Sequence, residues 1–151
     1  LLPLLAACAE SSLLPDEAGF GIVSGRWNGE RWEGLGFAVL QGDTLHVVGH
    51  RPDPGYYYDE YVRFSVPFRG EGVYEVPSSG GQLAQITGGD AGYFPPAAGA
   101  ARITGYSAGS AVVRGTLRLE AGGPDGAWRF EDGSFDVPVY PSFEAVPRWG
   151  R

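Results

Sequence analysis

Apolar and polar residues alternate along residues 111–121, and this is the clearest pattern in the chain. The apolar series is Ala111, Val113, Gly115, Leu117, Leu119 and Ala121, and the polar series around it is Ser110, Arg114, Thr116, Arg118 and Glu120, with Val112 as the one apolar exception. Side chains of a β-strand point alternately to opposite faces, so a period of two indicates a strand with one buried face and one solvated face. We therefore predict three long antiparallel strands over residues 102–138, with this strand in the middle.

The apolar positions change parity within the third of these strands. Trp128 and Phe130 occupy even positions, whereas Phe135 and the apolar residues after it occupy odd ones. One extra residue in a strand produces such a change, and a glycine in the left-handed conformation is the usual way to accommodate it. We predict a β-bulge at Asp132-Gly133, with Gly133 at positive φ.

Shorter alternating or apolar segments precede this region and are also predicted to be strands. They cover residues 20–27, 31–40, 44–50, 61–68, 73–76 and 83–87. Asn28-Gly29 has the preferred sequence of a two-residue hairpin turn, whereas residues 77–101 are rich in Gly and Pro and are predicted to be a long excursion that contains only the segment 83–87. The spacing predicts an all-β fold of about eight to nine strands, either an antiparallel β-sandwich or a flattened β-barrel.

Composition and charge narrow the class of protein. A chain of 151 residues is long enough for one domain with a sizeable core. Its 25 glycines, 12 prolines and 13% aromatic residues favour strands and turns over helices. The formal net charge of −7 argues against nucleic acid as a partner and against a polybasic surface that binds membranes.

The first eighteen residues resemble an export segment followed by a tether. Leu1 to Leu5 are typical of the apolar core of a signal peptide, and Leu5-Ala6-Ala7-Cys8 resembles a bacterial lipobox, in which the Cys carries the lipid. The alternative is an ordinary secretory signal with an incidental Cys. We divide the chain into a signal-peptide remnant with the lipobox (1–8), a polar tether (9–18), a single β-domain (19–140) and a C-terminal tail (141–151).

The residue after the lipobox bears on the membrane to which the protein is sent. Ala9 stands where an Asp would hold many lipoproteins at the inner membrane. We therefore expect an exported protein, anchored in the bacterial outer membrane through a lipid on Cys8 and facing either the periplasm or the cell surface. Each buried methylene of an acyl chain contributes about 0.8 kcal/mol, so several chains would anchor the domain firmly. Cys8 is the only Cys, which excludes an intramolecular disulfide.

Structural glycines and core aromatic residues recur in four runs of the chain. These are Phe68-Arg69-Gly70-Glu71-Gly72-Val73-Tyr74, Ile103-Thr104-Gly105, Val113-Arg114-Gly115-Thr116-Leu117-Arg118-Leu119 and Gly133-Ser134-Phe135-Asp136-Val137-Pro138. The runs resemble those of an uncharacterised family of small β-rich lipoproteins from Gram-negative bacteria, over roughly residues 19–138. The resemblance implies a β-domain of the cell envelope, and it provides no catalytic residue to transfer.

The richest cluster of polar and aromatic residues lies in the loop before the strand at 61–68. Its members are Asp53, Tyr56, Tyr57, Tyr58, Asp59, Glu60 and Tyr61. Tyrosine rings offer flat apolar faces with a hydrogen-bonding tip, and carboxylates accept hydrogen bonds from hydroxyl groups, so the set suits a sugar or a protein partner. The alternative is a loop whose tyrosines fold back over a sheet edge. If the protein binds a partner, we expect this loop to take part and at least two of its rings to be exposed.

Three other patterns carry less weight as sites of chemistry. The run Gly105-Tyr106-Ser107-Ala108-Gly109 matches the nucleophile elbow of serine hydrolases, but a strand pattern rather than a helix follows it, so we interpret it as a hairpin turn. His46 and His50 share one face of a strand but lie about 13 Å apart along it, too far to bind one metal ion together. Asp132, Ser134 and Asp136 could offer oxygens to calcium, but they do not match a calcium-binding loop.

These patterns favour a non-enzymatic, lipid-anchored lipoprotein of the cell envelope with a structural or binding role. The membrane is the expected partner through the lipid, and an envelope protein or a glycan is a possible second partner. We assign no catalytic residue, cofactor or metal. A β-barrel or sandwich that carries a small ligand or carbohydrate is the second hypothesis, and a small hydrolase that uses Asp or Glu pairs is the third.

Overall fold

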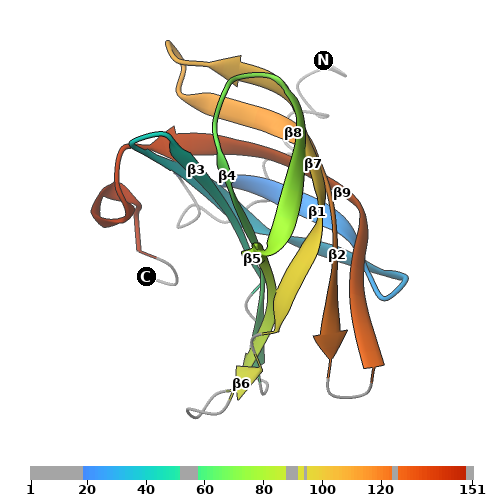
Figure 1. The fold of residues 1–151 in the computed structure, drawn as a ribbon. Helices are drawn as coiled ribbons and strands as arrows, with labels where there is room; N and C mark the ends of the chain where they lie inside the picture. Colours follow the sequence, from blue (N-terminus) through green and yellow to red (C-terminus); the bar gives the residue numbers. More distant parts are fainter. Residues whose placement is uncertain (1–18, 52–57, 88–91, 94, 124–125, 149–151) are drawn as a thin grey trace, which may run out of the picture.

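A computed structural model describes residues 19–51, 58–87, 92–93, 95–123 and 126–148. Cys8 and the tether therefore lie outside the described residues. Within the described part, nine strands form one sheet (Figure 1). They are β1 (Gly21–Trp27), β2 (Glu30–Gln41), β3 (Thr44–Arg51), β4 (Tyr58–Pro67), β5 (Gly72–Thr87), β6 (Gly92–Tyr93), β7 (Pro96–Ser107), β8 (Val112–Gly123) and β9 (Gly126–Tyr140).

The sheet closes into an antiparallel barrel of eight strands, which confirms the all-β prediction. Strands that follow one another in the chain pair in turn from β1 to β5 and from β7 to β9, and β5 pairs with β7. Closure comes from β1, which pairs antiparallel with β9. The short strand β6 pairs only with the end of β5. A meander of this kind brings alternate strand ends together at the two open ends of the barrel.

Two sequence predictions about segments 73–87 and 77–101 are wrong in the same region. Instead of two short strands inside a long excursion, β5 is one strand of 16 residues, and β7 already begins at Pro96. The register between β5 and β7 shifts between Val76 and Gly81, where the chain bulges. The bulge and the small residues of β7 interrupt the alternation of apolar and polar side chains, so these residues carried no recognisable strand pattern.

Large apolar side chains fill the barrel interior. The predicted inner face of β8 is confirmed from Val113 to Ala121, and Val113, Leu117 and Leu119 are all buried. The prediction is wrong for Ala111, which is exposed and precedes β8 with φ of 51°. Aromatic rings from distant strands meet there, with centroids 5.6 Å apart for both Phe64 with Phe135 and Trp32 with Phe130. The interior residues form one continuous core cluster.

The predicted bulge in β9 exists, but its left-handed residue is not the glycine. Between Gly133 and Phe130, β9 uses three steps where β8 uses two, which is one extra residue. Asp132, with φ of 52°, adopts the left-handed conformation, and the positive φ predicted for Gly133 is wrong. Asp tolerates this conformation better than most residues. Gly133 is needed for space instead, since a Cβ there would lie 2.5 Å from the Leu117 carbonyl oxygen.

A second, smaller core lies on the outside of the barrel. Phe37, Val39 and Val48 point outward from β2 and β3 and are buried all the same. The segment after β9 covers them: Val146 packs against this cluster, and the ring of Phe143, in the 3₁₀ helix Phe143–Ala145, lies 6.3 Å from that of Phe37. Residues 143–146 of the predicted tail are therefore part of the packed domain.

Candidate functional site

One open end of the barrel gathers polar and aromatic residues from most of the strands; we call it the mouth. The turn between β1 and β2 lies there, together with the end of β3 and the start of β4 (Figure 1). Asn28 and Gly29 form the predicted hairpin turn, with φ of 51° and 84°. Such positive φ values match the twist of the flanking strands, which is why Asn-Gly is favoured there. The turn fixes Trp27 and Trp32 at the mouth.

Glu60 is the centre of the mouth. It points into the barrel from β4 and is only 6% exposed. Its Oε1 accepts hydrogen bonds from Trp32 Nε1, at 3.0 Å, and from Arg51 Nη2, while Oε2 accepts one from Gln85 Nε2 at 2.8 Å. A buried carboxylate is stable only with such partners, because desolvation of an unpaired charge is costly. Four strands are thereby tied together through one side chain.

Three tryptophans surround this network. The ring of Trp27 lies 6.2 Å from that of Trp32 and 5.5 Å from that of Trp128. The Arg51 guanidinium lies 5.8 Å from the centre of the Trp32 ring, within cation–π range. A cavity of about 270 Å³ opens onto these groups, and Asn28, Glu30 and Arg31 complete its lining. The three rings are only 2–7% exposed, so a small ligand in this cavity would meet their margins beside charged and amide groups that can bind its hydroxyl groups.

The predicted binding loop is connected to this site at both ends. Asp53, Tyr56 and Tyr57 lie outside the described residues, and for Tyr58 the structure describes only the backbone, at the start of β4. β3 ends at Arg51 and β4 begins at Tyr58, and Arg51 and Glu60 are paired across these two strands. The expectation of exposed tyrosine rings therefore stays a prediction.

Asp59 and Tyr61 point away from Glu60, toward the outer face. Asp59 Oδ2 lies 3.3 Å from His50 Nε2, and the His50 ring stacks on Tyr61 with centroids 4.6 Å apart. Burial lowers the pKa of His50, and Asp59 opposes this shift because a nearby negative charge favours the imidazolium. Burial, and then Asp59, raise the pKa of Tyr61. The described loop side chains are thus divided between the two faces of β4: Asp59 and Tyr61 face outward, and Glu60 reaches the mouth.

The other candidate residues occupy ordinary positions in the sheet. His46 and His50 lie on one outer face of β3, as predicted, and His46 Nδ1 lies 2.7 Å from Ser65 Oγ. Ser107 ends β7 at a hairpin turn that leads into β8. Asp136 accepts a hydrogen bond from Arg114 at 3.0 Å. Among the described residues, no group of three or more His, Cys, Asp or Glu side chains is placed to hold a metal ion.

Sequence reasoning missed most of the mouth. Trp27, Trp32, Arg51, Gln85 and Trp128 were not selected, because each looks like a strand residue when its own segment is considered alone. The sequence nevertheless contained a pattern from which the mouth could have been predicted. Two tryptophans flank an Asn-Gly turn, and in a sheet whose consecutive strands pair, alternate turns lie at the same end of the barrel. Residues next to such turns should be considered together.

Comparisons with family models, with curated proteins and with solved structures found no match to this chain. In the part of the chain that the structure describes, no helix has the length and apolar character needed to span a membrane.

Proposed function

We propose that this chain is the ligand-binding β-domain of a lipid-anchored lipoprotein of the bacterial cell envelope, and that it acts without catalysis. Its ligand is a neutral sugar or the sugar unit of a glycan, bound at the mouth. The observation that supports this most directly is the cavity of about 270 Å³ in which tryptophan rings adjoin the Glu60 network. The lipid anchor rests on the lipobox at Cys8.

The packing of the barrel favours the mouth over a central cavity. Phe64, Phe130 and other large side chains occupy the interior and contact one another in one cluster. A ligand carried along the barrel axis would have to displace them, and closely packed interiors resist such changes. A ligand in the cavity at the mouth would leave Phe64 and Phe130 in place, because neither side chain lines that cavity.

The mouth also retains unused hydrogen-bonding capacity. Arg51 has five N–H donors, and Nη2 binds Glu60, so further donors can point toward a ligand. Its side chain is 43% exposed, which places these donors within reach of solvent molecules. Asn28 Oδ1 accepts a hydrogen bond from the Arg129 backbone N–H, and Gln85 Nε2 donates to Glu60, so the Asn28 NH2 group and the Gln85 amide oxygen are the donor and the acceptor that these side chains can offer a ligand. Hydroxyl groups of a sugar need such mixed partners.

The test is a titration followed by tryptophan fluorescence. Three of the chain's four tryptophans line the cavity, so binding there should change their emission. We would titrate a panel of neutral mono- and disaccharides into the full chain, and into the variants Arg51→Gln and Asn28→Gly. The second variant keeps a turn that glycine favours, while it removes an amide from the rim together with the hydrogen bond that Asn28 Oδ1 accepts from the Arg129 backbone N–H. We expect saturable binding of at least one sugar, weakened several-fold by both variants.

Arg69→Gln is the matched control, because Arg69 lies beside Tyr74 and away from the mouth. Binding that is unaffected by both mouth variants, or equally weakened by the control, contradicts the proposed site.

The anchor is tested separately: cells that express a precursor with a complete signal peptide are labelled with radioactive fatty acid. Equal labelling of a Cys8→Ser form would exclude the lipobox.

A further inference from the structure

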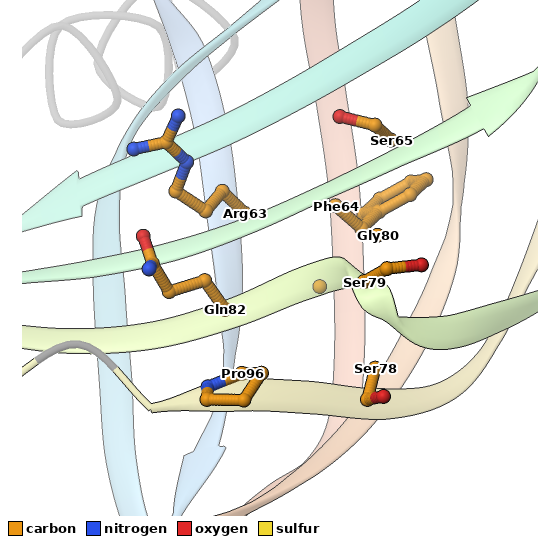
Figure 2. A pocket seen from close by; sticks show the side chains of 9 residues that line it. Arg63, Phe64, Ser65, Ser78, Ser79, Gly80, Gln82 and Pro96 are labelled. Carbon is orange, nitrogen blue, oxygen red and sulfur yellow. The ribbon is translucent and has the colours of Figure 1, made fainter.

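A polar groove lies on the outer wall of the barrel, away from the mouth (Figure 2). It has a volume of about 390 Å³ and crosses β4, β5 and the start of β7. Arg63, Gln82 and Pro96 are paired in register across these three strands and form one side of the groove. The hydroxyl groups of Ser65 and Ser79 lie on the other side, next to Ser78.

The bulge in β5 creates this groove. The pairing of β5 with β4 extends only from residue 81 onward, and its pairing with β7 skips residues 77–80. The backbone of these four residues is thus out of register with both neighbouring strands. At Gly80 the chain lies close to β4, where a Cβ would lie only 2.9 Å from the Ser65 carbonyl oxygen, so a side chain at this position would not fit without a shift.

All the polar side chains of the groove can donate hydrogen bonds, and its only charge is positive. Arg63 supplies a guanidinium, Gln82 an amide, and Ser65, Ser78 and Ser79 supply hydroxyl groups. Among the described residues, no carboxylate forms an ion pair with Arg63. Three other cavities on the described part of the chain each include at least one Asp or Glu in their lining. In a chain of net charge −7, a donor-lined groove without a carboxylate favours an anion.

His46, on the neighbouring strand β3, contacts a side chain of the groove and can therefore be used to detect a ligand there. Its Nδ1 lies 2.7 Å from Ser65 Oγ, and its other neighbours are the Phe143 ring, at 5.3 Å, and the positive charge of Arg63. Burial, and then Arg63, lower the pKa of His46. An anion beside Arg63 and Ser65 would offset the positive charge and raise that pKa again.

We propose that this groove binds the phosphomonoester group of a larger molecule, through the Arg63 guanidinium with the Ser65, Ser78 and Ser79 hydroxyls and the Gln82 amide around it. Guanidinium groups match the geometry of phosphate oxygens, and hydrogen bonds to an ionised group are stronger than those between neutral groups. The groove is open to solvent on the outer wall, so the rest of the ligand can extend away from it. The inference does not depend on the mouth, and either site can exist without the other.

The test uses nuclear magnetic resonance on the full chain produced without lipid as the Cys8→Ser form. Inorganic phosphate is titrated at constant ionic strength, with sodium chloride as the balancing salt, while the His46 ring signals are followed. We expect saturable shifts and a raised His46 pKa. Arg63→Gln should weaken binding about tenfold or more, since it removes a hydrogen bond to a charged group. Ser78→Ala/Ser79→Ala, a change in an exposed bulge, should weaken binding several-fold and provides a second variant if Arg63→Gln does not fold.

Two further titrations distinguish the source of the phosphate group. Glucose 6-phosphate represents a soluble monoester, and phosphatidylcholine vesicles with or without phosphatidic acid represent a lipid headgroup. Arg63-dependent binding of either one supports the proposal and names the source. Arg118→Gln, an exposed arginine on β8, is the control and should leave binding unchanged. The proposal is overturned if chloride alone reproduces the shifts, if the control weakens binding as much as Arg63→Gln, or if neither monoester binds.

Discussion

Replacement of Glu60 by alanine is the most informative single change at the mouth. The carboxylate joins β4 to Trp32 on β2, Arg51 on β3 and Gln85 on β5. Glu60→Ala removes the common acceptor and leaves three donors behind. The Trp32 N–H suffers most, because Trp32 is 2% exposed and water cannot easily replace the lost partner. We therefore expect a clear loss in the free energy of unfolding.

The size of the loss follows from the burial of each partner. A buried donor left without its acceptor costs about 1–3 kcal/mol, which applies to Trp32 and in part to Gln85. The Arg51 side chain is 43% exposed, so its ion pair is discounted to about 0–1 kcal/mol. Glu60→Ala should then cost about 2–4 kcal/mol. Glu60→Gln keeps one acceptor oxygen, and the Gln85 amide can turn to match it, so about 1–2 kcal/mol is expected.

Urea unfolding at neutral pH measures this cost directly. The unfolding midpoint should fall in the order wild type, Glu60→Gln, Glu60→Ala, with little change in the denaturant slope. Glu75→Ala is the matched control, because Glu75 also sits in a strand but is exposed on the outer face. A loss for Glu60→Ala no larger than that of the control would show that the hydrogen-bonded network does not stabilise the mouth.

Two further changes test the bulge and the histidines. Asp132→Gly should change the free energy of unfolding by no more than about 0.5 kcal/mol, since glycine favours positive φ, whereas Gly133→Ala should cost about 1–3 kcal/mol through its clash with the Leu117 carbonyl; the reverse order in urea unfolding would reject this description. In the folded protein the pKa of His46 and of His50 is lowered from 6.5, so each histidine binds its proton in the unfolded chain before it does so in the folded one. The free energy of unfolding should therefore be highest above about pH 6.5. As the pH drops toward the folded-state pKa values, it should fall by at most about 1.4 kcal/mol per pH unit for each histidine. His50→Gln should reduce this loss between pH 7 and 5, and an unchanged slope would show that His50 does not contribute.

The fold could be predicted because alternation is a local signal with a strong physical cause. Successive residues of β8 point alternately to the dry face and to the wet face, and the sequence shows this alternation directly. The bulge in β9 was found in the same way, from a change of parity. The conformation of each bulge residue could not be predicted in this way, because the bulge needs two different residues: Asp132 adopts the left-handed conformation, and Gly133 avoids a clash. These two roles can be told apart only when the position of the neighbouring strand β8 is known, because the clash at Gly133 is with the Leu117 carbonyl of that strand.

The candidate site could be predicted only in part, because it depends on residues that pair across the barrel. Glu60 was chosen for its loop, yet its neighbours on either side, Asp59 and Tyr61, face outward and belong to the surroundings of His50. The partners of Glu60 lie 28, 9 and 25 residues away along the chain. Strand registers must be known before such distances become contacts, and registers are set by the turns and by the hydrophobic pattern of all strands together.

The two proposed sites share one physical origin. A packed interior leaves no room along the barrel axis, and continuous pairing leaves the backbone of most strands occupied. Ligands can therefore be accommodated where this regular arrangement stops. It stops at the mouth, where strands end and polar side chains such as Glu60 and Arg51 meet, and in β5, where residues 77–80 leave the register of both neighbours. Although both sites draw on β4 and β5, their linings share no residue, so loss of one should leave the other intact, and the Arg51→Gln and Arg63→Gln variants can each serve as the control for the other.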